Sequence, residues 1–259
     1  MKKTPLAALP EGIPAEVASL LEEAPLYDSS SSPEARVIYT PRDGGLYLKR
    51  SPRGTLAKEA EMTSYFYKKH LSAEPLVYIS AGEDFFLTRA AVGEDATAAR
   101  YLAEPRRLAA ASGEALRALH EESFDACPIK DRTGDYIGAV NEGYRTGRFD
   151  ASFAPRGIKT AEEAYRVFCD GATALGTRVL LHGDYCLPNI LFDGWRQSAF
   201  IDLGAAGVGD RHIDLFWGAW TLCYNLGTDA YRDTFYAAYG RECINTDLID
   251  LIGCAECFG

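Results

Sequence analysis

Two short apolar runs, each followed at once by polar residues, constrain the fold of this chain more than any other feature. Residues 178–181 lead into His182-Gly183-Asp184, and Asn189 follows five residues after Asp184. Residues 198–201 lead into Asp202-Leu203-Gly204. Apolar runs of this length are typical of short buried β-strands. The pattern therefore predicts two strands that end in loops bearing carboxylate and amide side chains.

The polar residues at these two loops match the requirements of phosphoryl transfer. The reaction uses a group that accepts the hydroxyl proton and oxygen ligands that hold Mg²⁺ against the phosphates of ATP. Protein kinases supply an Asp, an Asn five residues later, and a second Asp that opens a tripeptide ending in Gly. In the same order, the sequence predicts Asp184 as the catalytic base, and Asn189 and Asp202 as metal ligands.

Each of these short motifs also has an ordinary structural interpretation. His-Gly-Asp alone is a common loop tripeptide, and Asp-Leu-Gly alone is a common turn. Their order and spacing together favour catalysis. The kinase template has no imidazole in the chemical step, so we expect the His182 ring to bond nearby backbone.

Taken together, these motifs resemble those of the aminoglycoside phosphotransferases, especially the 3′-phosphotransferase branch. That signature is close to His-Gly-Asp-x-x-x-x-Asn-Ile followed by Ile-Asp-Leu-Gly, and the likeness runs from a Ser-Pro-containing hairpin near residue 32 to a Glu-x-Phe at Glu256 and Phe258. It implies an α+β, bilobal protein-kinase-like fold. A small β-rich nucleotide-binding lobe is expected at residues 1–91, and a larger, mostly helical catalytic and substrate-binding lobe at residues 92–259. The implied activity is ATP- and Mg²⁺-dependent phosphorylation of an aminoglycoside hydroxyl, which gives antibiotic resistance.

The resemblance also implies a nucleotide site in the first lobe. Strand-like runs at residues 35–39 and 46–49 follow a Ser-rich segment, where Ser32 is the candidate phosphate contact; a flexible linker is the alternative reading of this segment. Lys49 is expected to contact the phosphates while a helix Glu fixes its ammonium group. Glu59 and Glu61 are both candidates, but they lie about 200° apart on a helix, and the family pattern matches Glu59.

A second hairpin, at residues 76–80 and 85–93, leads into the expected connection between the lobes. In kinases the adenine bonds the backbone of this connection, so its side chains are loosely specified. By that likeness, Thr88, Arg89 and Ala90 are the candidate adenine contacts. The sequence leaves open whether GTP replaces ATP.

The acceptor side departs from the family pattern. Residues 141–170 contain five acidic and five basic side chains, so they produce no local negative field to attract a polycation. Ala205 stands where the family usually has Arg, and only Glu256 remains of a carboxylate pair because residue 255 is Ala. Trp220 and Tyr224 occupy positions where an Arg and an acidic residue are expected. With Trp217 they share one helical face, which indicates either core packing or an aromatic wall for the acceptor. The substrate candidates are therefore Glu256, Phe258, Trp220 and Tyr224.

Composition excludes several other classes. The formal net charge of −10 disfavours nucleic-acid binding, which relies on clustered Lys and Arg. No apolar stretch reaches the roughly 18 residues of a membrane span, and no convincing signal peptide is present, so we expect a cytoplasmic protein. Seven irregularly spaced cysteines suit reduced thiols, and Cys254-x-x-Cys257 lacks the second ligand pair of a zinc site. The oligomeric state is open.

Two other functions compete with an aminoglycoside kinase. One is a kinase of a different hydroxylated metabolite or antibiotic, which the altered acceptor positions favour. The other is a catalytically inactive nucleotide-binding module. Workable residues at all five catalytic and phosphate-positioning sites argue against the inactive module: Lys49, Glu59, Asp184, Asn189 and Asp202.

Overall fold

The structure is a computed structural model that describes residues 3–21, 23–31 and 35–259. The chain divides into two compact units. The first comprises Met1–Asp95 and Leu191–Gly204, and the second comprises Ala96–Ile190 and Ala205–Gly259. The expected lobe boundary after residue 91 remains a prediction. In the described ranges, no helix combines the length and the apolar character needed to cross a bilayer.

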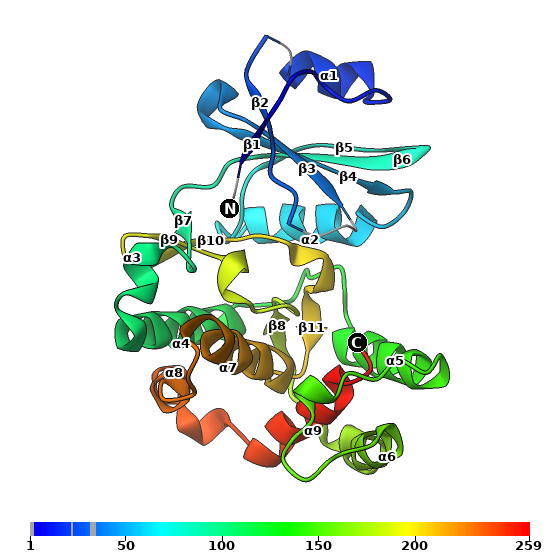
Figure 1. Cartoon of the computed structure of the whole chain (residues 1–259), viewed down its shortest axis with the longest axis vertical. Coiled ribbons are helices and arrows are strands. Elements are labelled where there is room, and N and C mark those ends of the chain that lie inside the picture. Colours follow the sequence, from blue (N-terminus) through cyan, green and yellow to red (C-terminus); the bar gives the residue numbers. More distant parts are fainter. Residues whose placement is uncertain (1–2, 22, 32–34) are drawn as a thin grey trace. The chain divides into compact units, whose positions relative to one another are not determined.

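The first unit is built on an antiparallel sheet. Within the described residues this sheet has six strands in the order β1-β2-β3-β4-β6-β5. Helices α1 (Ala15–Leu21) and α2 (Ala57–Tyr67) cover its opposite faces (Figure 1). The strands are β1 (Thr4–Leu6), β2 (Leu26–Asp28), β3 (Arg36–Thr40), β4 (Leu46–Pro52), β5 (Pro75–Ala81) and β6 (Glu83–Arg89).

Strand β4 shows how alternation assigns side chains to the two faces. Leu46 and Leu48 are buried in a cluster with Val17 and Leu21 of α1. The intervening face carries Lys49, which lies opposite Phe86 in the β4–β6 ladder, and Phe86 packs against Leu56 and Ala60 at the start of α2. Because successive side chains of a strand point to opposite faces, this register directs Lys49 toward α2.

A second, smaller sheet completes the first unit. Its strands are β7 (Glu94–Asp95), β9 (Ile190–Asp193) and β10 (Arg196–Phe200), in the order β10-β9-β7. The Phe200 ring packs edge-on against Phe66 of α2 at a centroid distance of 6.5 Å, and its N–H donates to Leu71 O at 2.8 Å. These contacts hold the end of β10, from which Asp202 follows.

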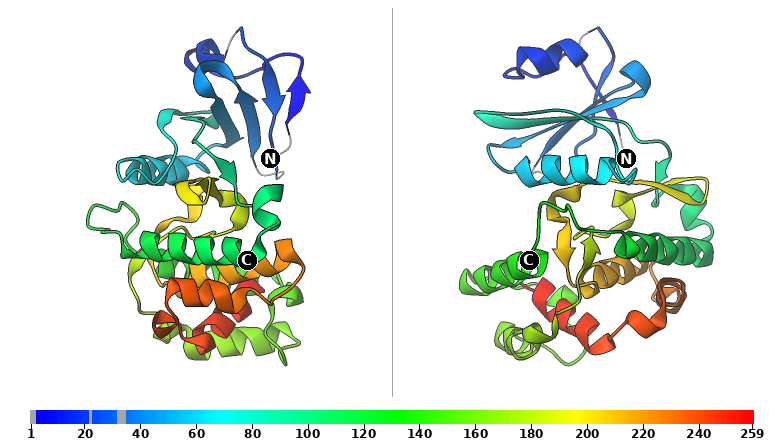
Figure 2. Two further views of the ribbon diagram at one scale, coloured as in Figure 1. Left: turned by 90° about the vertical axis from the view of Figure 1, so that its left-hand side faces the viewer. Right: turned by 180° about the vertical axis from the view of Figure 1, so that it is seen from behind.

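The second unit is mostly helical. Its helices are α3 (Ala99–Leu102), α4 (Pro105–Glu121), α5 (Arg132–Arg145), α6 (Ala161–Gly171), α7 (His212–Leu226), α8 (Arg232–Tyr239) and α9 (Thr246–Glu256). Helices α4 and α8 run side by side (Figure 2). A two-stranded ladder of β8 (Val179–Leu181) and β11 (Gly207–Gly209) packs among them, with Gly207 opposite Leu181. Leu181, Phe168 and Ile252 belong to the main apolar cluster of this unit.

Candidate functional site

In the first unit, Lys49 joins two carboxylates. Its Nζ lies 2.8 and 3.0 Å from the two oxygens of Glu59 and 2.6 Å from Oδ1 of Asp202. Burial lowers the pKa of Lys49, but Asp202 and Glu59 outweigh that effect and raise it above its ordinary value. Lys49 is therefore an ammonium ion that donates to both carboxylates. Glu59 makes the contact, whereas Glu61, about 200° away around the helix, is exposed.

Asp84 fixes the start of α2. This helix has no side-chain cap of its own at Leu56; instead, the fully buried carboxylate of Asp84 on β6 accepts the Leu56 N–H at 2.9 Å. Burial raises the pKa of Asp84, but hydrogen bonds from the Gly54 backbone, the Ser80 side chain and the Leu56 backbone lower it below its ordinary value. Asp84 therefore acts as an N-cap supplied from the sheet, and Glu59 lies in the turn that it anchors.

Asp202 has an unusual backbone. Its φ is +58°, in the left-handed region that non-glycine residues seldom adopt and Asp tolerates better than most. Its side chain is 46% exposed. Only Oδ1 contacts Lys49, so Oδ2 keeps its capacity to accept or to ligate.

In the second unit, Asp184 and Asn189 bond each other directly. The Nδ2 group of Asn189 donates to Asp184 Oδ2 at 2.8 Å and to Asp184 O at 3.0 Å. Both bonds use the amide nitrogen, which orients Oδ1 of Asn189 as a free acceptor. The Asp184 N–H lies 3.3 Å from Nδ1 of the buried His182 ring, which confirms the expected backbone contact of that imidazole.

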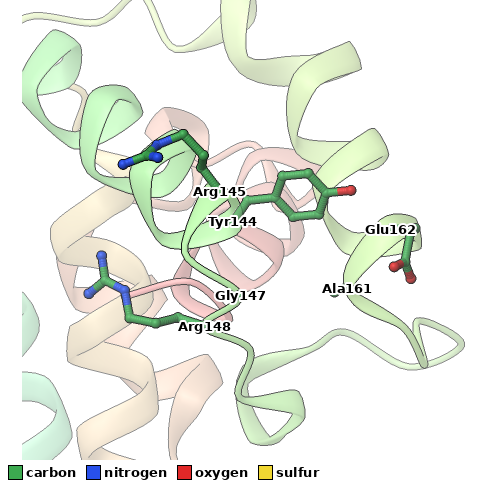
Figure 3. A pocket seen from close by; sticks show the side chains of 6 residues that line it. All are labelled: Tyr144, Arg145, Gly147, Arg148, Ala161 and Glu162. Atoms are coloured by element: carbon green, nitrogen blue, oxygen red, sulfur yellow. The ribbon is translucent and has the colours of Figure 1, made fainter.

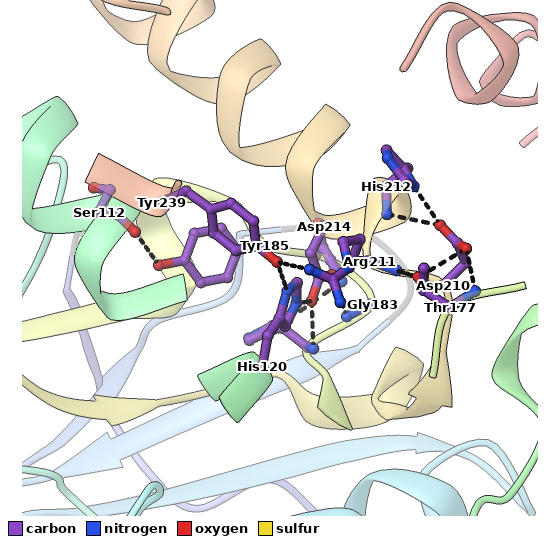
Figure 4. Close-up of polar contacts among 12 residues, drawn as sticks. Ser112, His120, Thr177, Gly183, Tyr185, Asp210, Arg211, His212, Asp214 and Tyr239 are labelled. Carbon is purple, nitrogen blue, oxygen red and sulfur yellow. Dashed lines mark hydrogen bonds and ion pairs between the residues drawn. The ribbon is translucent and has the colours of Figure 1, made fainter. Parts of the chain in front are cut away.

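Asp214 of α7 holds the backbone just before Asp184 (Figure 4). Its fully buried carboxylate accepts the N–H groups of His182 and Gly183, both at 2.7 Å, and lies 3.1 Å from Nε2 of His120. Burial lowers the pKa of His120, so a neutral ring donates from Nε2, while Nδ1 lies 2.8 Å from the Tyr239 hydroxyl. The loop is thereby tied to α4, α7 and α8.

Gly183 cannot be replaced in this loop without a shift. Its φ is +83°, and a Cβ placed there would lie 1.9 Å from the carbonyl oxygen of Ala205. Glycine is required here for both conformation and space.

A third polar group in the second unit surrounds Glu256. The Tyr136 hydroxyl of α5 donates to Glu256 Oε1 at 2.8 Å, and Trp217 Nε1 of α7 donates to the same oxygen at 3.0 Å. Burial raises the pKa of Glu256 to about 7; Tyr136 and Trp217 act against this shift, and the negative charge of Asp184 adds to it. Glu256 therefore feels the field of the predicted catalytic base.

The other acceptor candidates have different surroundings. Trp220 packs with Trp217 and stacks on Tyr224, with centroids 5.0 Å apart and ring planes within 12°. Tyr224 is 72% exposed, so this pair combines packing with an exposed aromatic face. Phe258 is fully buried, with Tyr144 at 5.6 Å between ring centroids, which assigns its side chain to packing.

The remaining nucleotide candidates are only partly visible. Ser32 lies outside the described residues. The N–H groups of Arg89 and Ala90 already donate to Glu74 O at 2.9 Å and Gly45 O at 2.8 Å. A contribution of Thr88, Arg89 or Ala90 to adenine binding would therefore use other backbone atoms, and it stays a prediction.

A hollow of about 480 Å³ in the second unit contains none of the predicted site residues (Figure 3). Its lining carries Arg145, Arg148 and Glu162, so it has no excess of negative charge to attract a cationic ligand. Acidic groups nearby are committed to local structure: Glu142 pairs with Arg145 at 2.6 Å, and Glu163 completes the capping box of α6. These pairings agree with the expectation that residues 141–170 produce no local negative field.

Comparisons with known proteins identify the family. The model of the phosphotransferase enzyme family matches residues 25–249. A probable aminoglycoside 3′-phosphotransferase from Lactococcus lactis is 47% identical over 251 residues, which cover 96% of each chain. The chain belongs to this family. The prediction that it is a phosphotransferase is confirmed.

Solved structures of other phosphotransferases share the fold. An aminoglycoside 3′-phosphotransferase of type VIII has a TM-score of 0.71 at 22% identity, and the match covers 90% of this chain and 91% of the other. The aminoglycoside phosphotransferase APH(3″)-Id from Streptomyces rimosus, solved with ADP and streptomycin, has a TM-score of 0.67 at 23% identity, covering 85% of this chain and 90% of the other. The predicted α+β, kinase-like fold is confirmed.

Asn189 and Asp202 each keep one side-chain oxygen of the kind that ligates Mg²⁺, and their role as metal ligands stays a prediction. In the part of the chain that the structure describes, no three His, Cys, Asp or Glu side chains form a metal site. Mg²⁺ commonly takes one or two protein oxygens and completes its shell with phosphates and water. Oδ1 of Asn189 and Oδ2 of Asp202 are oxygens of this kind.

Sequence reasoning missed the residues that support the site. Asp84, Asp214 and Tyr136 act through contacts with distant segments, and no local motif marks them. Trp217 was expected on the aromatic face of its helix, but its hydrogen bond to Glu256 was not. Tyr47 was also missed, although it lies two residues before Lys49 on the same strand face; its ring centroid is 4.8 Å from that of Tyr39. The signal available for Tyr47 was the alternation of the strand.

Proposed function

We propose that this phosphotransferase transfers the γ-phosphoryl group of ATP to the 3′-hydroxyl of an aminoglycoside. The observation that carries the proposal is the Asn189–Asp184 pair, in which both bonds use the Asn189 amide nitrogen and leave Oδ1 of Asn189 available to a metal. The relative from Lactococcus lactis, 47% identical over 96% of the chain, supports the acceptor class.

Each polar residue has a distinct role in this proposal. One oxygen of Asp184 is committed to Asn189, and the other accepts the proton of the attacking hydroxyl. Lys49, held by Glu59, binds phosphate oxygens. Asn189 and Asp202 would each supply an oxygen to Mg²⁺, which when bound would neutralise charge on the phosphates.

The acceptor is bound through Glu256 and the exposed Trp220–Tyr224 stack. Glu256 is the surviving carboxylate of the expected pair, because residue 255 is Ala. Each charge-assisted hydrogen bond contributes on the order of 1.5 to 3 kcal/mol, so the loss of two carboxylates, at Tyr224 and Ala255, weakens binding by several powers of ten. We therefore expect a narrow range of aminoglycosides rather than a broad one.

A decisive experiment uses a matched pair of acceptors. Kanamycin has a 3′-hydroxyl and tobramycin lacks it, so ADP release with ATP and Mg²⁺ should occur with kanamycin only. Asp184→Asn should lower kanamycin turnover by roughly 10² or more while ATP still binds. Equal turnover of the two compounds would contradict the 3′-assignment, and near wild-type turnover by the variant would contradict the base assignment. Replacing ATP by GTP tests the nucleotide.

A different hydroxylated metabolite is the second candidate acceptor. The Trp220–Tyr224 stack is the observation that favours it, because an exposed aromatic face packs well against a neutral or apolar ring. A panel of antibiotics and metabolites, with ADP release as the readout, separates the two candidates.

A further inference from the structure

The two hydrogen bonds to Glu256 end on one oxygen. Tyr136 from α5 and Trp217 from α7 both donate to Oε1, at 2.8 and 3.0 Å, although Glu256 is the last residue of α9. No hydrogen bond from the described part of the chain reaches Oε2. One oxygen is thus fixed in place by donors from two helices, and the other keeps its lone pairs.

The surroundings of this carboxylate leave its negative charge incompletely balanced. Glu256 is 8% exposed, so ionisation costs solvation, and two neutral donors offset only part of that cost. Of the charged groups that act on it, Arg132 on α5 favours ionisation and Asp184 opposes it. A cationic donor at Oε2 would supply the missing charge, whereas a neutral hydroxyl would not.

We propose that Tyr136 and Trp217 are positioning residues that set acceptor specificity: by fixing Oε1 of Glu256, they present Oε2 to one ammonium group of the acceptor. This inference rests on the proposed function, since it takes the acceptor to be an aminoglycoside. It assigns a role to two further residues, and it gives the two oxygens of Glu256 different partners.

Removal of either donor has a consequence that a purely structural residue would not have. Each lost hydrogen bond favours the protonated carboxyl, which cannot bind an ammonium group well. We expect the KM for kanamycin at neutral pH to rise about tenfold in Tyr136→Phe and in Trp217→Phe, with kcat changed less than about twofold. KM should fall as the pH rises and Glu256 ionises, and the midpoint of this fall should move upward by about one pH unit in each variant.

The experiment measures kcat and KM for kanamycin between about pH 6 and about pH 9. Tyr165→Phe is the matched control for Tyr136→Phe, because it removes a hydroxyl of the same unit that bonds Asn141 at 3.0 Å. Trp195→Phe is the control for the indole. Both controls should keep the wild-type KM and its pH midpoint. The amines of kanamycin titrate equally in every assay, so differences between variants report on the enzyme.

The outcomes separate this inference from the proposed function. Kanamycin turnover with wild-type KM and pH midpoint in both donor variants would overturn the inference alone. Absence of aminoglycoside turnover by the wild type would overturn both. Should one donor variant fail to fold, the other, which removes the second donor to Oε1, carries the test. A raised KM with an upward-shifted pH midpoint supports the inference, and a wild-type KM and midpoint refute it.

Discussion

Glu256 is a residue whose burial conflicts with its charge. Burial raises its pKa from an ordinary value of 4.5 to about 7. Between these two values the folded chain holds a proton on this side chain that the unfolded chain has lost. Stability from this group is therefore fully present below pH 4.5 and decreases as the pH rises to about 7.

The Glu256→Gln variant makes this cost measurable. Gln resembles the protonated carboxyl, so above pH 7 its free energy of unfolding should exceed that of the wild type by up to about 3 kcal/mol, because one pKa unit corresponds to about 1.4 kcal/mol. Urea denaturation of the two proteins over a pH series tests this, and the difference should vanish under acidic conditions. Glu242→Gln is the control, since the pKa of Glu242 is lowered and its replacement should give no stabilisation.

Helix α2 depends on a side chain from another element. Asp84 caps its first turn from strand β6, and that turn carries Glu59. Strand β6 therefore positions the start of α2, and α2 in turn positions the ammonium group of Lys49 through Glu59.

Asp84→Ala should accordingly affect both stability and nucleotide use. Loss of the cap costs about 1 to 2 kcal/mol and leaves buried N–H groups unpaired, so the KM for ATP should rise while the KM for the acceptor stays constant. Thr160→Ala, which breaks the capping box of α6, is the control: it should lower stability to a similar extent without changing the KM for ATP. Equal effects of both variants on ATP kinetics would argue against the positioning role of Asp84.

Elements with a clear local pattern were predictable, and those defined by distant contacts were not. The strands expected at residues 178–181 and 198–201 correspond to Val179–Leu181 and Arg196–Phe200. Helical periodicity showed that Glu59 and Glu61 cannot both face Lys49, and the family pattern then selected Glu59. By contrast, Gly207–Gly209 pairs with β8 as a strand although glycine disfavours one. A Cβ at Gly207 would lie 2.7 Å from Ile129, and a Cβ at Gly209 would lie 2.7 Å from Leu181 of β8, so distant contacts select glycine at both positions. The Tyr136–Glu256 bond joins residues 120 positions apart, which no local pattern reveals.

On the scale of the whole molecule, the chain passes between its two units at residues 95–96, 190–191 and 204–205. Lys49, Glu59 and Asp202 belong to the first unit, whereas Asp184, Asn189 and Glu256 belong to the second. The two proposed metal ligands thus belong to different units, so each unit alone carries only part of the proposed chemistry.

Thermal stabilisation by ATP and Mg²⁺ tests whether Asp202 contributes to metal binding. Asp202→Asn keeps a side chain that tolerates the left-handed backbone but removes the charge. We expect it to abolish activity and to lose the Mg²⁺-dependent part of the thermal stabilisation by ATP, which reaches about 2.7 kcal/mol at 100 times the Kd. Melting curves with ATP, in the presence of Mg²⁺ or of a chelator, provide the measurement. An undiminished Mg²⁺-dependent shift would show that Asp202 is only a turn residue.

The burial of Glu256 also affects which substitutions would accumulate at this position during evolution. Under the proposed function, selection on acceptor binding maintains this buried carboxylate although it lowers the stability of the fold. In populations propagated without an aminoglycoside, substitutions that neutralise position 256 would meet no opposition and would improve folding yield. Renewed exposure to an aminoglycoside would then select for reversion, so the residue at position 256 would reflect whether a population had recently met such a compound.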